Sequence, residues 1–187
     1  MNENDLRVIK TKKQFHEALV RLLKIKPLEA ISVSEICKLA NVNRGTFYFH
    51  YEQKEGLFEE YFREVIKDLE NSYHEPYQNL PIKPHEVAPS SLRIFHHVKK
   101  YSEFYKIVFS NKASLSYYYL FYEKIKMLVE EVLQYYKHLD INVALYSSYQ
   151  ANALIGMIMQ WVAEDFSYSV EYMNEQYARF LKIEKYD

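Results

Sequence analysis

A short polar and aromatic stretch near residue 50 carries side chains that suit contacts with nucleic acid. Arg44 can bind guanine through two hydrogen bonds, and Lys54 offers an ammonium group to a phosphate. Thr46 and Tyr48 carry hydroxyls for phosphate oxygens, and the Thr46 methyl suits the methyl of thymine. Gly45 has no side chain, so its backbone can approach a base edge closely. These groups together indicate recognition of DNA.

Two short helices joined by a tight turn are predicted to present these groups. The pattern S-x-x-E that starts at Ser32 is typical of a capping box and begins the first helix. Asn41 is expected to adopt positive φ in the turn, and Asn43 is expected to cap the second helix. A unit of this kind can lay its second helix in the major groove.

Helical periodicity continues along the rest of the chain, and no strand-like alternation persists. Four prolines between residues 76 and 89 mark the clearest break. We expect helices over residues 5–26, 32–40, 44–51, 54–73, 90–100, 102–110, 114–138, 141–164 and 169–185. The predicted fold is therefore all-α, with about nine helices.

The distribution of charge favours a DNA-binding segment at the N-terminus. Residues 1–56 hold ten Lys and Arg against seven Asp and Glu, whereas residues 57–187 hold fourteen against eighteen. The single cysteine, Cys37, excludes an intramolecular disulfide. The first residues lack the profile of a signal peptide, and the most apolar stretch, 153–159, is too short to span a bilayer. We expect a soluble, cytoplasmic protein.

The stretch ISVSEICKLANVNRGTFYFHYEQKEGLF closely resembles the N-terminal helix-turn-helix of the TetR/AcrR transcriptional regulators. The resemblance is strong over residues 6–62 and looser over 153–173. It implies contacts to the DNA backbone from some positions and to bases from others. The candidate DNA-binding residues are Ser32, Ser34, Asn43, Arg44, Gly45, Thr46, Tyr48, Phe49, His50 and Lys54. The chain departs from the family at Asn41, where glycine is usual, and at Phe49, where a polar residue often lies.

The resemblance also implies two domains, a DNA-binding domain over residues 1–56 and an effector-binding and dimerisation domain over 57–187. Aromatic side chains that could line an effector pocket are Phe95, Phe104, Tyr105, Phe109, Tyr118, Phe121, Tyr122 and Trp161. Candidates for a homodimer interface are Ser148, Asn152, Gly156, Gln160, Tyr172 and Tyr177. From the residues alone, such rings are more often ordinary core, and the stripes on the helices are equally consistent with packing inside one subunit.

The predicted function is a homodimeric repressor that a small aromatic or lipophilic effector releases from a palindromic operator. An activator, a regulator that depends on a protein coregulator, a nonspecific DNA-binding protein and a pure interaction module remain alternatives. An enzyme is disfavoured, because the three glycines form no phosphate loop and the adjacent His96 and His97 point about 100° apart on a helix. No cofactor or metal ion is expected.

Overall fold

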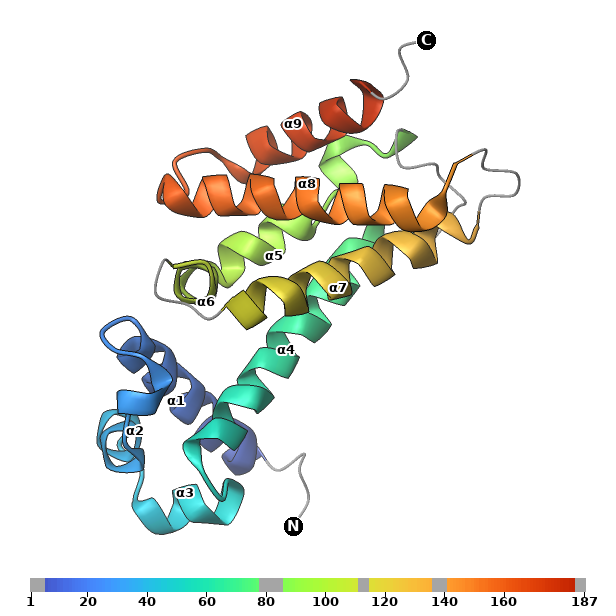
Figure 1. The fold of residues 1–187 in the computed structure, drawn as a ribbon. Coiled ribbons are helices and arrows are strands. Elements are labelled where there is room, and N and C mark those ends of the chain that lie inside the picture. The colour runs from blue at the N-terminus through green and yellow to red at the C-terminus, as the bar shows by residue number, and fades with distance from the viewer. Residues whose placement is uncertain (1–5, 78–85, 111–114, 136–140, 184–187) are drawn as a thin grey trace. The chain divides into compact units, whose positions relative to one another are not determined.

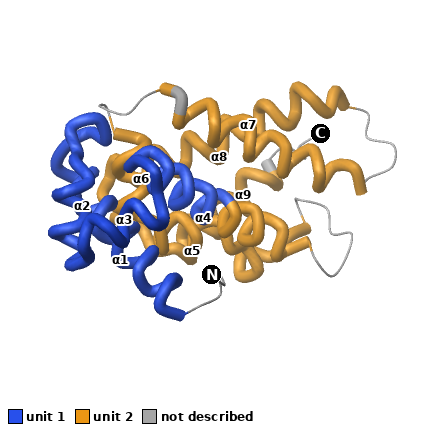
Figure 2. Tube along the Cα trace, turned by 90° about the horizontal axis from the view of Figure 1, so that it is seen from below, with its two compact units in different colours: residues 1–66 blue, residues 67–187 orange. Residues whose placement is uncertain are grey.

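The computed structural model describes residues 6–77, 86–110, 115–135 and 141–183, and the regular elements in these ranges are all helices (Figure 1). The prediction of an all-α fold with about nine helices is therefore confirmed. The chain forms two compact units, Met1–Ile66 and Lys67–Asp187 (Figure 2). Within the described ranges, every helix is too short or too polar to cross a membrane.

Unit 1 contains three short helices and the first half of a longer one. Its elements are α1 (Leu6–Leu23), the 3₁₀ turn η1 (Leu28–Ala30), α2 (Val33–Ala40), α3 (Arg44–His50) and the beginning of α4 (Lys54–His74). Their apolar faces meet in a closed core, whose fully buried members include Phe15, Leu19, Ile36, Phe47 and Leu57. This core fixes the directions in which the polar faces of α2 and α3 point.

Local hydrogen bonds define both ends of α2. Ser32 caps it, since its hydroxyl accepts from the Glu35 N–H at 3.3 Å and the Glu35 carboxylate accepts from the Ser32 N–H at 2.9 Å. The bond from Lys26, followed by those from Ser32, lowers the pKa of Glu35 to about 2, so the cap stays charged. Asn41 ends the helix in the left-handed conformation, with φ 54° and ψ 44°. The predicted capping box and the predicted positive φ are both confirmed.

Unit 2 contains the end of α4 and five further helices. These are α5 (Ile94–Lys100), α6 (Ser102–Val108), α7 (Leu115–Leu133), α8 (Val143–Ala163) and α9 (Val170–Ile183), with 3₁₀ turns η2 (Glu75–Tyr77) and η4 (Pro89–Ser91). Helices α7 and α8 lie side by side, and α9 packs against η4 and α5 (Figure 1). Helix α6 also contacts α8, so α8 packs against at least two helices of its own unit.

The predicted helix positions agree with the structure, and the differences lie at the ends. Helix α1 stops at Leu23 rather than at residue 26, because Pro27 disfavours helical backbone in the residue before it. Helix α5 begins at Ile94 rather than at residue 90, because Pro89 starts the separate turn η4. The predicted end of the 114–138 helix falls beyond residue 135, outside the described residues.

The left-handed Asn41 gives a direct test of the turn. We expect Asn41→Gly to keep both stability and DNA binding, because glycine adopts positive φ freely. Asn41→Val is expected to lower the free energy of unfolding by about 1–2 kcal/mol and to abolish DNA binding, because a β-branched residue is strained there. Thermal unfolding of the three proteins measures the effect. Equal stability of all three would contradict this account of the turn.

Candidate nucleic-acid interface

Helix α3 buries one aromatic ring and exposes the next two. Phe47 is fully buried in the core of unit 1, whereas Tyr48 and Phe49 are 50% and 64% exposed. Arg44 Nη2 lies 3.3 Å from the Tyr48 hydroxyl, and the guanidinium carbon lies 5.8 Å from the centre of the Tyr48 ring. Core packing of Phe47 therefore presents Arg44, Tyr48 and Phe49 to solvent on a rigid helix.

The start of α3 is held by its own cap. Asn43 Oδ1 accepts from the Thr46 N–H at 2.9 Å, and the Thr46 hydroxyl lies 3.3 Å from the same oxygen. A Cβ on Gly45 would lie 3.2 Å from that oxygen, which is closer than most Cβ contacts in proteins. Glycine at this position thus leaves room for the cap as well as for an approaching base edge. The Oδ1 atom of Asn43 is thus engaged in the cap, and its amide nitrogen is the group left for a contact with a base.

Two of the candidate residues lie on α2. Ser32 is the exposed N-cap, and its hydroxyl also donates to Glu35 Oε2 at 2.8 Å. Ser34 is exposed in the first turn of the helix. Both side chains are accessible. The Ser32 hydroxyl belongs to the capping box, whereas the Ser34 hydroxyl does not.

Lys54 has a structural role that was not predicted. Its ammonium donates to the carbonyls of Glu29 at 2.9 Å and Ile31 at 2.7 Å, and its side chain is only 17% exposed. These two bonds join the start of α4 to the loop that precedes α2. Lys54 therefore holds two parts of unit 1 together, and one N–H remains for a phosphate. A side chain that bonds backbone carbonyls leaves no sequence pattern, which is why this role was missed.

His50 ends α3 and is half-buried. Burial, followed by the nearby Lys12 ammonium, lowers its pKa below the ordinary value. The imidazole is therefore neutral at pH 7. It can donate one hydrogen bond to a phosphate, but it adds no charge to the surface.

A hollow of about 520 Å³ opens beside α3. Five of the candidate residues line it, and helix α1 supplies the rest of the wall. The lining residues are Arg7, Val8 and Thr11 from α1, with Asn43, Gly45, Thr46, Phe49 and His50. The α1 residues were not among the candidates, because their spacing in the sequence marks only a helix face.

The position of α3 relative to α1 and α4 depends on Glu60. The Lys12 ammonium lies 2.7 Å from Glu60 Oε1, and the Tyr51 hydroxyl donates to Glu60 Oε2. Burial would raise the pKa of Glu60, but the bonds from Lys12 and Tyr51 outweigh it and hold the pKa below its ordinary value. Because Tyr51 is the residue directly after α3, this carboxylate fixes the end of the helix that carries the exposed rings.

In unit 2, most rings predicted to line an effector pocket are packed against one another. Tyr105 and Phe109 lie 5.4 Å and 5.5 Å from Phe121, between ring centres, and Phe95 lies 5.9 Å from Trp161. Side chains of this group that are fully or almost fully buried are Phe95, Phe104, Tyr105, Phe121 and Trp161. Tyr118 and Tyr122 are half-buried and bond to α8. The pocket role of these eight residues remains a prediction.

A narrow cavity in unit 2 has a different lining. Only about 10 Å³ of it admits the centre of a water molecule, so in this conformation it has room for little more than one water. Its walls are tyrosines, one glutamine and aliphatic side chains from α4, η2, α7, α8 and α9. The lining residues are Tyr73, Tyr77, Val129, Val132, Leu133, Tyr146, Gln150, Tyr177 and Leu181. None of the eight predicted pocket residues belongs to this set.

The residues predicted for a dimer interface fall into three groups. Ser148 and Asn152 accept or share hydrogen bonds with the Tyr122 and Tyr118 hydroxyls of α7, inside the subunit. Gly156, Gln160 and Tyr172 are exposed. Tyr177 is buried, with its ring centre 5.9 Å from that of Phe95, so it faces the core of its own unit.

Comparisons with known proteins agree with this architecture. Residues 16–61 match the family model of bacterial regulatory proteins of the tetR family, and residues 85–182 match a transcriptional regulator C-terminal region. An uncharacterized HTH-type transcriptional regulator of Bacillus subtilis, YxbF, is 22% identical over 170 residues, which cover 87% of this chain and 42% of that protein. The chain thus spans less than half of that relative.

Solved structures share the fold at low sequence identity. The dihydroxyacetone kinase operon activator DhaS aligns with a TM-score of 0.68 and 20% identity, covering 94% of this chain and 96% of that chain. The fatty acid degradation regulator FadR from Bacillus halodurans aligns with a TM-score of 0.70 and 17% identity, covering 91% and 94%. These similarities support the two-part helical fold.

The bonds of Lys54 predict two separable effects of its replacement. Lys54→Met should lower the free energy of unfolding by about 1–3 kcal/mol, because two hydrogen bonds from a charged donor are lost. If the remaining N–H also contacts a phosphate, the slope of log affinity against log salt falls by about 1. Chemical unfolding and DNA titrations at several salt concentrations measure the two effects. Unchanged stability would contradict the structural role, and Lys54→Arg is the matched control.

Proposed function

The chain belongs to the TetR family of bacterial transcriptional regulators, and we propose that it represses transcription by binding a palindromic operator as a homodimer. A small molecule that binds unit 2 releases the DNA. The protein acts in the cytoplasm, where bacterial DNA is accessible. In this proposal unit 1 reads the operator, and unit 2 carries the dimer interface and the effector site.

The observation that carries the proposal is the exposure pattern of α3. In seven residues the helix buries Phe47 completely and leaves the arginine and two rings beside it accessible. The guanidinium of the exposed Arg44 lies beside Tyr48 and can bind guanine through two hydrogen bonds. The neighbouring Tyr48 is half exposed, and its hydroxyl can donate to a phosphate oxygen. If α3 served only to pack unit 1, Phe49 would be expected in the core, whereas it is exposed.

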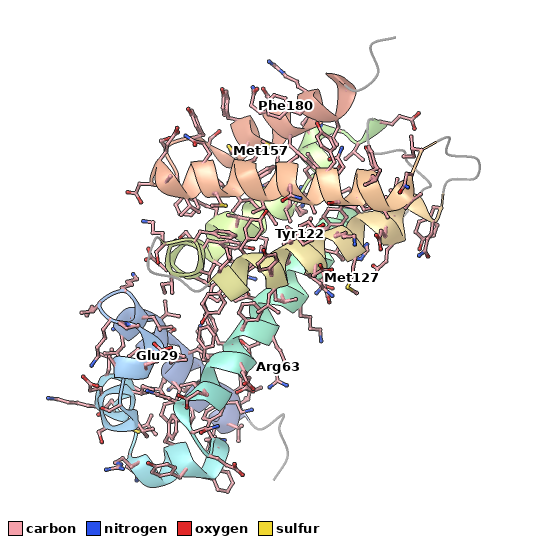
Figure 3. All side chains as sticks on the ribbon, in the orientation of Figure 1. Glu29, Arg63, Tyr122, Met127, Met157 and Phe180 are labelled. Atoms are coloured by element: carbon pink, nitrogen blue, oxygen red, sulfur yellow. The ribbon has the colours of Figure 1, made fainter. Side chains whose placement is uncertain are left out.

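Exposed apolar side chains on α8 and α9 support the homodimer. Leu145 and Tyr149 on α8 and Phe180 on α9 are about half exposed or more, and Figure 3 labels Phe180 on its helix. A Cβ placed on Gly156 meets no heavy atom within 4 Å, so packing inside the subunit does not require glycine there. A glycine in a helix interior costs about 1 kcal/mol relative to alanine. Close approach by a second copy of α8 explains its presence.

The chemistry of unit 2 supports an uncharged aromatic or lipophilic effector. The narrow cavity is walled by tyrosines, a glutamine and aliphatic side chains, and no charged residue lines it. Such a wall favours a ligand with apolar surface and a few groups that form hydrogen bonds. Tyr73 belongs to α4, the helix that begins in unit 1, so a ligand in this cavity would act directly on that helix.

Selection from a random pool of DNA duplexes at near-physiological salt tests DNA recognition. We expect enrichment of a palindrome whose half-sites lie about one helical turn apart, because a two-fold dimer presents two copies of α3. Arg44→Ala should weaken binding to that site by about 1–3 kcal/mol and relax the preference at one base pair. Binding that depends steeply on salt but shows no preference would instead indicate a nonspecific binder. A reporter gene under the selected operator separates repression from activation.

Gly156 gives a test of the dimer. Gly156→Leu should leave the subunit folded, because Gly156 is exposed and a Cβ there meets no heavy atom within 4 Å, but should raise the dimer dissociation constant about tenfold or more. Gly56→Leu is a matched control, since Gly56 is also a helical glycine with open space around it. Analytical ultracentrifugation measures both. A dimer unaffected by Gly156→Leu would place the interface elsewhere.

A further inference from the structure

The most exposed aromatic residue of α3 is Phe49, on the proposed DNA-binding face. Its side chain is 64% exposed, and its ring is in edge contact with His50 at 5.1 Å between centres. A phenyl ring has no hydrogen-bond donor or acceptor, so it cannot recognise the amino and carbonyl groups of base edges. Any base contact that it makes must be apolar.

Apolar groups make up part of the lining of the hollow beside this ring. Phe49 and Thr46 of α3, with Val8 and Thr11 of α1, contribute a phenyl ring and methyl groups, and Gly45 adds no side chain. Asn43 and His50 add polar groups, and the exposed Arg7 adds a cation. The lining therefore offers apolar contacts as well as a positive charge.

In the major groove of DNA, the 5-methyl group of thymine is the one apolar feature of the base edges. Adenine, guanine and cytosine present donors and acceptors, which lose hydrogen bonds with water when a phenyl ring covers them. The thymine methyl instead gains from leaving water. The ring of Phe49 would thus favour thymine for two reasons: it contacts the methyl group, and it offers no hydrogen bond to the polar groups of the other bases.

We propose that the hollow between α1 and α3 is a binding site for the 5-methyl group of a pyrimidine in the operator. Phe49 is its specificity-determining residue, and Val8 and Thr11 of α1 complete the apolar wall. Arg7 at the rim binds the neighbouring phosphate. The proposal rests on the proposed operator binding and adds to it the chemistry of one base position.

Replacement of thymine by deoxyuridine tests the proposal, because it removes the methyl group and keeps every hydrogen-bonding group. Each thymine of the selected operator is replaced in turn, symmetrically in both half-sites, and the affinity is measured by fluorescence anisotropy. For the wild-type protein we expect binding to weaken by about three- to fivefold per lost methyl contact at one position. Replacement at the other thymines should leave the affinity unchanged.

Variants of the protein identify the residue responsible. Phe49→Ala should bind the thymine and deoxyuridine operators equally, whereas Tyr48→Phe, the matched control, should still prefer thymine. Thermal unfolding checks that each variant is folded. If Thr46→Ser abolishes the preference and Phe49→Ala keeps it, the contact belongs to Thr46 and the proposal is overturned.

Two failures are distinguishable. If the wild-type protein selects no sequence at all, operator binding itself is wrong. If it selects an operator but binds thymine and deoxyuridine equally at every position, operator binding stands and the methyl site is wrong.

Discussion

Helix α4 is one unbroken helix that belongs to both units, and each unit holds it through a carboxylate. In unit 1, Glu60 accepts hydrogen bonds from Lys12 of α1 and from Tyr51, which follows α3. In unit 2, Asp68 accepts from His97 Nδ1 at 2.7 Å, and the Lys100 ammonium lies 2.6 Å from its other oxygen. Burial would raise the pKa of Asp68, but these partners outweigh it and keep the pKa below its ordinary value. About two turns of α4 separate the two carboxylates along the helix.

The contact at Asp68 continues into the aromatic core of unit 2. Desolvation lowers the pKa of the buried His97, although Asp68 acts in the opposite direction, so the ring is neutral at pH 7. A neutral ring that donates from Nδ1 to Asp68 must accept at Nε2, and the Tyr105 hydroxyl lies 2.9 Å from that atom. Tyr105 in turn packs against Phe121 of α7. A buried polar group that loses its hydrogen-bond partner costs about 1–3 kcal/mol. A rearrangement of the aromatic core that separates Tyr105 from His97 therefore carries this cost, and His97 is the residue that bonds Asp68 of α4. This chain of contacts connects the aromatic core of unit 2 to Asp68 of α4.

The sequence was sufficient for features whose cause is local. The capping box at Ser32, the left-handed Asn41 and the helices themselves follow from residue type and short-range spacing. Features that depend on distant partners were not predictable. The carbonyls that bind Lys54 come from residues 25 and 23 positions away, and the neighbours that bury Tyr177 come from another helix. The link between α8 and α9 shows the same limit, because Asp165 and Phe166 both adopt positive φ without glycine. Phe166 is held there by its edge contact with Trp161 at 5.0 Å and by the Lys99 ammonium at 4.9 Å from its ring.

Close packing of unit 2 sets a condition on any effector. A ligand among the rings around Phe121 has to separate aromatic pairs that stabilise the packed state by about 0.5–1.5 kcal/mol each. It also has to break the Tyr105–His97 bond or build around it. Entry at the narrow cavity near Tyr146 disturbs neither the rings around Phe121 nor the Tyr105–His97 bond, but only about 10 Å³ there admits the centre of a water molecule, so the walls of this cavity also have to move apart. A ligand shifts a conformational equilibrium only by the difference between its affinities for the two states. In either place, part of the binding energy of a ligand is used to open unit 2, and only the remainder can shift the conformational equilibrium.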